Sequence, residues 1–303
     1  GIVADGKIQV REDIYLTPSI GFRRATEALG TPNTTTAQAP TVVDTIPVKL
    51  GFYQRFNRFF YEVGGGAVRF QYTDYSQILA GSLPASSRNR WEYEERFRLG
   101  YEITDDVALY VQPTWSQVRY ISQINAVDQD RDSNNFGTNL GFTWTRDPTT
   151  SFDGSLGYTT RNYTTGSISP TSATTAALSG SWNGYAPLTL RPLITRGITE
   201  TSQANYASAI LTTFGLDFAY VIHDVWTATG GLAYSLTDNI PVNPSTTPYR
   251  TDRITRASLG FQYQLRPQVG IGPLFEYTQG SSTDPQGLDY NRAQISIRLT
   301  AKR

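Results

Sequence analysis

Apolar and polar residues alternate along the chain with a period of two. In the stretch WEYEERFRLGYEI, residues 91–103, one set of positions includes Trp91 and Phe97, while the other includes Arg96 and Arg98. Such alternation is typical of a β-strand with one apolar and one polar face. No segment shows a convincing 3.6-residue period of an amphipathic helix. The pattern therefore predicts an all-β chain.

The alternation recurs in fourteen segments, and the connections between them differ systematically in length. Seven long polar connections, about 24–40, 74–88, 121–135, 164–172, 199–205, 238–252 and 279–289, alternate with six short turns such as RFNR, TDD and QLRP. This arrangement predicts a single transmembrane antiparallel up-and-down β-barrel of about 14 strands, with short periplasmic turns and long extracellular loops. The predicted strands contain residues 14–22, 46–52, 58–73, 91–103, 107–115, 140–144, 152–158, 176–182, 188–194, 210–220, 226–236, 257–263, 269–277 and 293–299.

The predicted strands are long enough to cross a bilayer. Thirteen residues at about 3.3 Å each, tilted by roughly 40°, rise about 33 Å, more than the apolar band of roughly 25 Å. The aromatic face of 91–103 then meets lipid and its charged face lines the interior, with Glu95, which breaks the apolar face, expected near the outer rim. Four prolines also fall in the outward register, where they predict bulges or positions near the rims: Pro18, Pro113, Pro192 and Pro273.

Composition excludes several classes of function and one way of crossing a membrane. The chain has 303 residues with 26 basic and 26 acidic ones, so there is no electrostatic reason to expect nucleic acid as a partner. No apolar run reaches the 18 or so residues of a transmembrane helix. Cysteine is absent, which excludes disulfides and thiolate chemistry, and the absence of methionine even at residue 1 suggests that the chain begins after a processed segment. Residues 1–303 are expected to form one barrel domain, with 1–12 available as a periplasmic N-terminal extension.

The inward register supplies the candidate functional residues. Charges of both signs there would pair across strands or line a wet lumen, since fourteen strands lie between barrels filled by side chains and open channels. A salt-bridged filling without transport is the competing interpretation. The predicted lumen-lining residues are Tyr15, Lys49, Tyr53, Glu92, Glu94, Arg96, Arg98, Tyr110, Gln112, Arg256, Gln262, Glu276, Arg292 and Arg298.

Catalytic, metal and cofactor sites have little support. The single histidine, His223, lies in a short turn without a nucleophile or base to pair with it, so no enzyme activity is expected. Asp128, Asp130 and Asp132 have the spacing of a calcium loop, but Ser133 and Asn139 replace its glycine and its bidentate glutamate, so a solvated acidic loop is the preferred interpretation. No nucleotide-binding motif is present, and no cofactor is expected.

Three stretches resemble the bacterial family called putative β-barrel porin 2: IYLTPSIGF (14–22), GSWNGYAPLTLRP (180–192) and YQLRPQVGIGPLFEYTQGSSTDPQGLDYNRAQISIRL (263–299). The resemblance covers most of the chain and implies an outer-membrane barrel, in some members encoded with exopolysaccharide or capsule export machinery. It carries no catalytic or ligand-binding residues over to this chain. The sequence departs from the pattern in GFRRATE after the first strand and in a C-terminal ISIRLTAKR that lacks a terminal aromatic residue.

The first functional hypothesis is a water-filled channel, with export of an exopolysaccharide as its specific form. Its expected surroundings are outer-membrane lipid and lipopolysaccharide, with a periplasmic polysaccharide-export protein as a partner; the oligomeric state stays open. The alternative is a non-conducting structural or surface-display barrel that assembles with itself or a partner. A soluble β-sandwich or lectin-like protein is a third possibility. Segments 24–40 and 74–88 are long enough to fold inward as a constriction.

Overall fold

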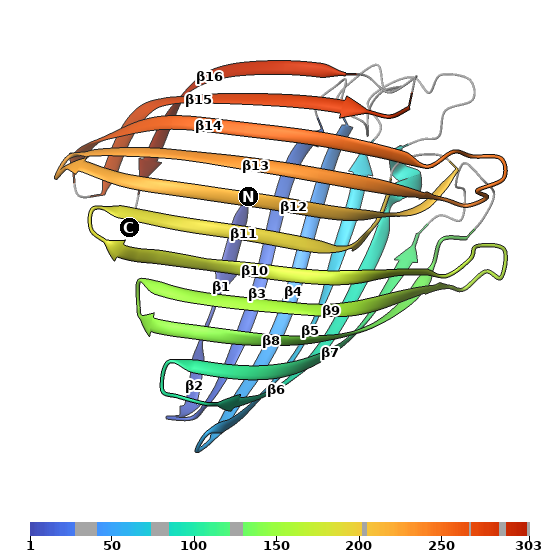
Figure 1. Cartoon of the computed structure of the whole chain (residues 1–303), viewed down its shortest axis with the longest axis horizontal. Helices are drawn as coiled ribbons and strands as arrows, with labels where there is room; N and C mark the ends of the chain where they lie inside the picture. Colours follow the sequence, from blue (N-terminus) through green and yellow to red (C-terminus); the bar gives the residue numbers. More distant parts are fainter. Residues whose placement is uncertain are drawn as a thin grey trace.

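The chain folds into one antiparallel β-sheet, shown by a computed structural model in Figure 1. The structure describes residues 1–27, 41–73, 85–121, 130–201, 205–266, 268–284 and 289–301. Each long strand pairs with the next one along the chain, which gives an up-and-down sheet, and one short 3-10 helix, η1 (Ala85–Arg88), precedes β6. Among the described residues, no helix has the length and apolar character needed to cross a bilayer.

Fourteen long strands correspond to the fourteen predicted segments. Long and short connections alternate between them as predicted, and the short ones include Asn57 with a positive φ of 55° in the turn after β4, where asparagine tolerates the left-handed region. The strands are β3 (Ile14–Glu27), β4 (Thr41–Phe56), β5 (Phe59–Thr73), β6 (Arg90–Glu102), β7 (Val107–Tyr120), β8 (Ser133–Asp147), β9 (Thr150–Tyr163), β10 (Thr171–Tyr185), β11 (Leu188–Thr199), β12 (Tyr206–His223), β13 (Trp226–Pro241), β14 (Arg250–Arg266), β15 (Val269–Ser282) and β16 (Tyr290–Ala301).

The predicted strand number of about 14 is wrong for the sheet as a whole, which has 16 strands. The two additional strands are β1 (Ile2–Asp5) and β2 (Ile8–Arg11), and both pair with the outer edge of β3. Residues 1–12, considered above as a periplasmic extension, thus lie along the sheet. Each of these strands has four residues, too few to produce a clear alternation in the sequence.

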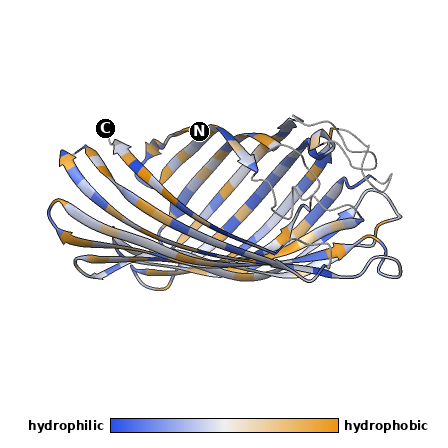
Figure 2. Cartoon of the chain, turned by 90° about the horizontal axis from the view of Figure 1, so that it is seen from above, coloured by the Kyte–Doolittle hydropathy of each residue, from blue (hydrophilic) through white to orange (hydrophobic). Residues whose placement is uncertain are grey.

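The sheet is curved but not closed. Figure 2 shows it as a trough whose strands rise on both sides of an open face. Among the described residues, β16 pairs only with β15, and neither β1 nor β2 pairs with β16. The predicted up-and-down topology is confirmed, while the two edges of the sheet stay apart in this structure.

The two faces of the sheet differ as the alternation predicts. Large apolar side chains project from the convex face, such as Leu140 and Leu156, which pair with each other and are 68% and 70% exposed. The polar register faces the concave side, because Arg98 on β6 contacts Asp153 on β9, three strands away, which only the inner side of a curved sheet allows. The hydropathy colouring in Figure 2 alternates along the strands accordingly.

All four outward prolines lie inside strands, and three of them interrupt the ladder with the preceding long strand. At Pro113, Pro192 and Pro273 the ladder with the preceding strand lacks two residue pairs. Proline has no amide hydrogen to donate, so these gaps follow from its chemistry. These prolines therefore lie at breaks in the ladder. This agrees with the predicted bulges better than with the predicted positions near the rims.

Glu95 lies in the middle of β6, so the prediction that it sits near the rim is wrong. It faces outward between Gly65 on β5 and Trp115 on β7. Gly65 has no side chain, and this bare position leaves a depression of about 590 Å³ on the apolar face, lined also by Phe97 and Phe136. The depression gives the Glu95 carboxyl room among apolar neighbours.

We expect removal of this outward carboxyl to stabilise the protein. Glu95→Leu should raise the free energy of unfolding in liposomes by about 1 kcal/mol, because a lipid-facing acidic residue costs less than the roughly 2–4 kcal/mol of a basic one at the bilayer midplane. Urea unfolding followed by tryptophan fluorescence measures the change. Glu94→Leu, the same change at the neighbouring inward position, is the control and should give no such gain; equal gains would contradict a lipid-facing Glu95.

Candidate functional site

The structure places all fourteen predicted lumen residues in the concave register of the sheet. The pairings fix this assignment: Tyr15 is opposite Tyr53, and Glu94 is opposite Ser116 on β7. Nine of the fourteen lie on β3 to β7, and five lie on β14 to β16. That they line a water-filled lumen stays a prediction.

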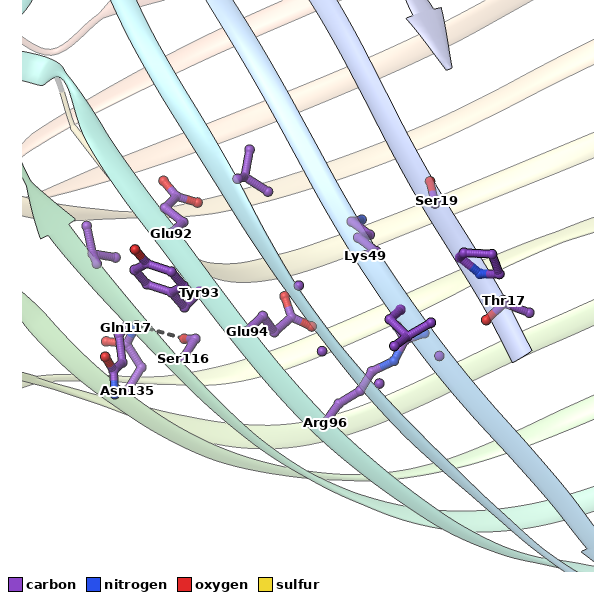
Figure 3. A pocket seen from close by; sticks show the side chains of 18 of the residues that line it. Thr17, Ser19, Lys49, Glu92, Tyr93, Glu94, Arg96, Ser116, Gln117 and Asn135 are labelled. Carbon is purple, nitrogen blue, oxygen red and sulfur yellow. Dashed lines mark hydrogen bonds between the residues drawn. The ribbon is translucent and has the colours of Figure 1, made fainter. Parts of the chain in front are cut away.

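A hollow on the concave wall brings four of these residues together. It has a volume of about 670 Å³ and is lined by residues of β3 to β9, by Asp5 of β1 with the adjacent Gly6, and by Ile198 of β11. Figure 3 shows Lys49, Glu92, Glu94 and Arg96 around it, and Asn135 donates a hydrogen bond to Ser116 at 2.9 Å on one side. The other charged residues that line it are Asp5 and Arg161.

Two glycines form the floor of the hollow. Gly64 and Gly66 occupy the concave register of β5, and a Cβ at Gly64 would lie 2.9 Å from Nε of Arg96. A Cβ at Gly66 would lie 3.0 Å from Cγ of Lys49. Both basic side chains can therefore lie against the bare backbone of β5, which explains the glycines at positions 64 and 66 of the run VGGGAV.

The charges that line the hollow balance. Asp5, Glu92 and Glu94 oppose Lys49, Arg96 and Arg161. Arg96 pairs with Glu62 at 2.8 Å and Glu92 pairs with Arg90 at 2.7 Å, whereas within the described residues Lys49 and Glu94 have no hydrogen-bond or ion-pair partner. These two free side chains flank the glycine floor and can contact a solute directly.

A second group of predicted residues forms a hydrogen-bonded network beside the hollow. Arg98 donates to Gln112 at 2.8 Å and to Asp153 at 2.9 Å, and its guanidinium lies 3.9 Å from the centre of the Tyr110 ring. The Tyr110 hydroxyl donates to the same Asp153 at 2.7 Å. This network fixes β6, β7 and β9 relative to one another and is a structural feature of the wall.

The other predicted residues lie apart from the hollow. Tyr15 and Tyr53 stack with ring centres 4.5 Å apart near the short-turn end of β3 and β4. Gln262 donates to Thr300 on β16 at 2.5 Å. Arg256, Glu276, Arg292 and Arg298 occupy β14 to β16, far from the hollow in sheet order.

A buried ionic cluster at the long-loop end was missed by the sequence analysis. Glu200, directly after β11, forms an ion pair with Arg161 and accepts a hydrogen bond from the Tyr120 hydroxyl. The Arg161 and Glu200 side chains are 5% and 8% exposed, so the pair is removed from water. Arg131 contacts the same segment by donating to the carbonyl of Thr201 at 3.0 Å.

The cluster keeps Glu200 ionised. Burial alone would raise the pKa of the Glu200 carboxyl, but Arg161, Arg90 and the Tyr120 hydroxyl together hold that pKa below its usual range. The carboxylate therefore carries its charge throughout the neutral pH range.

Residues 200 and 201 connect this cluster to the opposite part of the sheet. Thr201 donates to Asn239 on β13 at 2.9 Å, and Asn239 donates to Asp252 on β14 at 3.0 Å. Asp252 in turn pairs with the buried Arg250 at 2.9 Å. A polar chain thus crosses the concave side from β7 and β9 to β14, which we call the polar bridge: Tyr120, Arg161, Glu200, Thr201, Asn239, Asp252 and Arg250.

The structure gives no support for a calcium site in the loop that contains Asp130 and Asp132. Asp128 lies outside the described residues, while Asp130 accepts hydrogen bonds from the amide of Asp132 and from Thr164. Burial raises the pKa of the Asp132 carboxyl, which disfavours its charged form. Among the described residues, no group of three potential metal ligands is found. His223 ends β12 beside a short turn, as predicted.

Comparisons with known proteins agree with this fold. A family model described as "Putative beta-barrel porin 2" matches residues 1–303. The ferric citrate transporter FecA is similar in structure, with a TM-score of 0.54 and 13% identity over 97% of this chain and 54% of that protein. The FrpB iron transporter from Neisseria meningitidis gives a TM-score of 0.53 and 8% identity over 94% of this chain and 52% of that protein.

These structural similarities concern the fold. The chain spans about half the length of the FecA and FrpB structures that it matches. At such low identity, the likeness indicates an outer-membrane type of up-and-down sheet and carries no ligand across. No curated protein matches the chain.

Proposed function

Because the chain belongs to the putative beta-barrel porin 2 family, we propose that its sheet closes in the membrane into a barrel that forms a water-filled channel. The family, the all-β fold and the apolar convex face together indicate the bacterial outer membrane. A lipid-facing strand needs apolar residues at alternate positions only, as this chain has. Outer-membrane lipid and lipopolysaccharide are the surroundings that this face fits.

The observation that carries the channel proposal is the charge-balanced hollow. Three acidic and three basic side chains line a cavity of about 670 Å³ on the concave wall, and the free Lys49 and Glu94 flank its glycine floor. A strongly selective ion pore would favour one sign of charge. Balanced charge with many hydroxyl and amide groups fits an uncharged or weakly charged hydrated solute, and we propose a polysaccharide chain passed on by a periplasmic export protein.

Single-channel recording in planar bilayers tests the proposal. The purified, refolded protein should give reproducible conductance steps with weak preference between cations and anions. Lys49→Gln and Glu94→Gln are matched variants that each remove one charge from the hollow, and they should shift the reversal potential in opposite directions in a salt gradient. Conductance that neither variant alters would place the permeation path elsewhere.

A second candidate function is a non-conducting structural barrel, and the polar bridge is the observation that favours it. Buried groups cross the concave side at the long-loop end, where Ser133, Ser208 and Asn239 are also almost fully buried. If the barrel is a channel, the polar bridge is a constriction of its lumen. If the barrel is structural, the polar bridge closes the lumen at the long-loop end. A folded protein that never conducts would support the structural barrel.

A further inference from the structure

Both edges of the open sheet can serve as strands in the wall of a transmembrane barrel. One edge is the segment Ile2–Arg11, formed by β1 and β2, which we call the N-terminal edge; the other is β16 (Tyr290–Ala301). Among the described residues, the outer side of each edge has no pairing partner. In hydrocarbon, unpaired backbone amides and carbonyls are too costly to persist, so both edges need a partner once the sheet is in a membrane.

The N-terminal edge has the face pattern of a membrane-spanning strand. Its pairing with β3 puts Ile2 and Ala4 on the same outward face as Phe22 and Ile20, and Ile8 on that of Leu16. Ile2, Ile8 and Val10 are 77%, 55% and 59% exposed, which suits lipid and would be unfavourable in the periplasm.

Apart from Val3, the opposite register of the N-terminal edge is polar, and it belongs to the concave wall. Asp5 lies opposite Ser19, Gln9 lies opposite Tyr15, and Nζ of Lys7 lies 4.0 Å from the centre of the Tyr15 ring. Asp5 also lines the hollow described above. The segment therefore contributes to the same interior surface as the long strands.

The N-terminal edge is continuous despite its division into two strands. The amide of Gly6 donates to the carbonyl of Pro18 at 2.9 Å, between the two strands. Pro18 has no amide hydrogen with which to return that bond, so the ladder weakens locally at this point. Counted as one strand, β1 and β2 bring the wall to fifteen strands together with β3 to β16.

Strand direction limits how the edges can meet. Consecutive long strands alternate in direction, so β16 runs antiparallel to β3, and the N-terminal edge also runs antiparallel to β3. The N-terminal edge and β16 therefore run parallel to each other. Closing a sheet with an odd number of strands requires one parallel pair, whereas the even number usual in bacterial barrels avoids it.

We propose that β16 pairs in parallel with the N-terminal edge, so that the barrel closes with fifteen strands. This inference rests on the proposed closure of the sheet in the membrane. Lengths agree, since residues 2–11 face a twelve-residue β16. Charges agree as well: Asp5 presents a carboxylate on the concave face, Arg292 and Arg298 present guanidiniums there, and none of the three has a hydrogen-bond or ion-pair partner within the described residues.

The alternative seam joins β16 directly to β3 and gives fourteen strands. It requires the N-terminal edge to leave β3, because both would occupy the same side of that strand. Leaving would break the ladder to residues 14–22 and move Ile2 and Ile8 away from the lipid-facing surface. The fifteen-strand seam keeps every pairing that the structure contains.

Cysteine crosslinking distinguishes the seams, and the chain contains no native cysteine to interfere. Ile8→Cys is combined in turn with a cysteine at four outward positions of β16: Ala293, Ile295, Ile297 and Leu299. Leu16→Cys on β3, which pairs with Ile8, is combined with the same four as the matched control. The full chain is folded into liposomes and oxidised, and intrachain and interchain disulfides are separated by non-reducing electrophoresis.

We expect an intrachain disulfide from position 8 to at least one position of β16, and none from position 16. In the fifteen-strand wall, β3 is two strand spacings, about 9.6 Å, from β16, beyond the roughly 7 Å reach of a disulfide. Disulfides from position 16, none from position 8, or only interchain disulfides would each overturn the proposal. Conductance of the same samples is read separately: a crosslinked but silent barrel contradicts the channel and leaves the seam intact.

Discussion

Leu156→Arg is expected to lower the free energy of unfolding in a lipid bilayer by about 2–4 kcal/mol. Leu156 lies in the middle of β9 on the convex face, opposite Leu140, and is 70% exposed in the structure. In water an exposed leucine replaced by arginine would cost almost nothing. The large expected cost arises only if this face meets hydrocarbon, where a guanidinium loses its hydration.

Ala177→Arg is the matched control for this prediction. Ala177 on β10 pairs with Ser155, the residue before Leu156, so it lies next to Leu156 along the ladder but on the concave face. The same new side chain should leave stability nearly unchanged there and alter only conductance. Urea titration in liposomes measures both variants, and equal stabilities would contradict a lipid-facing convex surface and favour a soluble sheet protein.

The sequence predicts which residues share a face, because a period of two depends only on the strand itself. Phe97 and Arg98 were assigned to opposite faces from alternation alone, and the pairings agree. The extra strands β1 and β2 were not predicted, because Gly6 and the facing Pro18 divide the N-terminal edge into pieces of four residues. How the edges meet depends on the curvature of the whole sheet, which no local pattern contains.

Part of the candidate site could be predicted, because the face on which a residue lies depends only on the alternation within its own strand. The facing of Lys49 and Glu94 follows from alternation, whereas the floor formed by Gly64 and Gly66 depends on how β4, β5 and β6 pair. The polar bridge was missed, since Glu200 meets Tyr120 across eighty positions of sequence. Residues 28–40 and 74–84, which make up most of the two segments predicted as constrictions, lie outside the described residues.

The inward arginine of β9, Arg161, is a feature of the sequence from which the polar bridge could have been predicted. Arg161 lies in the inward register near the long-loop end of its strand, as does Arg90 on β6. Buried guanidiniums need an acidic partner, and Glu200 is an acidic residue in a long-loop connection at the same end of the sheet. The ionic cluster thus combines a strand pattern with a loop residue that only the folded chain brings together.

Glu200→Gln is expected to destabilise the protein by about 3–5 kcal/mol at neutral pH, because it leaves the buried Arg161 without its counter-charge. Glu62→Gln is the matched control: its partner Arg96 is 45% exposed, so loss of that pair should cost at most about 1 kcal/mol. Urea unfolding in liposomes measures both. A loosened bridge should also make single-channel currents larger or noisier if it is the constriction.

The pH dependence of the stability difference between the unmodified protein and Glu200→Gln gives a second, independent test. The folded-state pKa of Glu200 is lower than its unfolded value, so its stabilising contribution is fully present above the ordinary glutamate pKa of roughly 4.3 and is lost as the pH falls through the lowered folded value. The stability gap between the unmodified protein and Glu200→Gln should therefore be constant near neutrality and shrink in acid. A gap that stayed constant into strong acid would mean that the lost contribution is packing and that the buried charge pair does not hold the bridge.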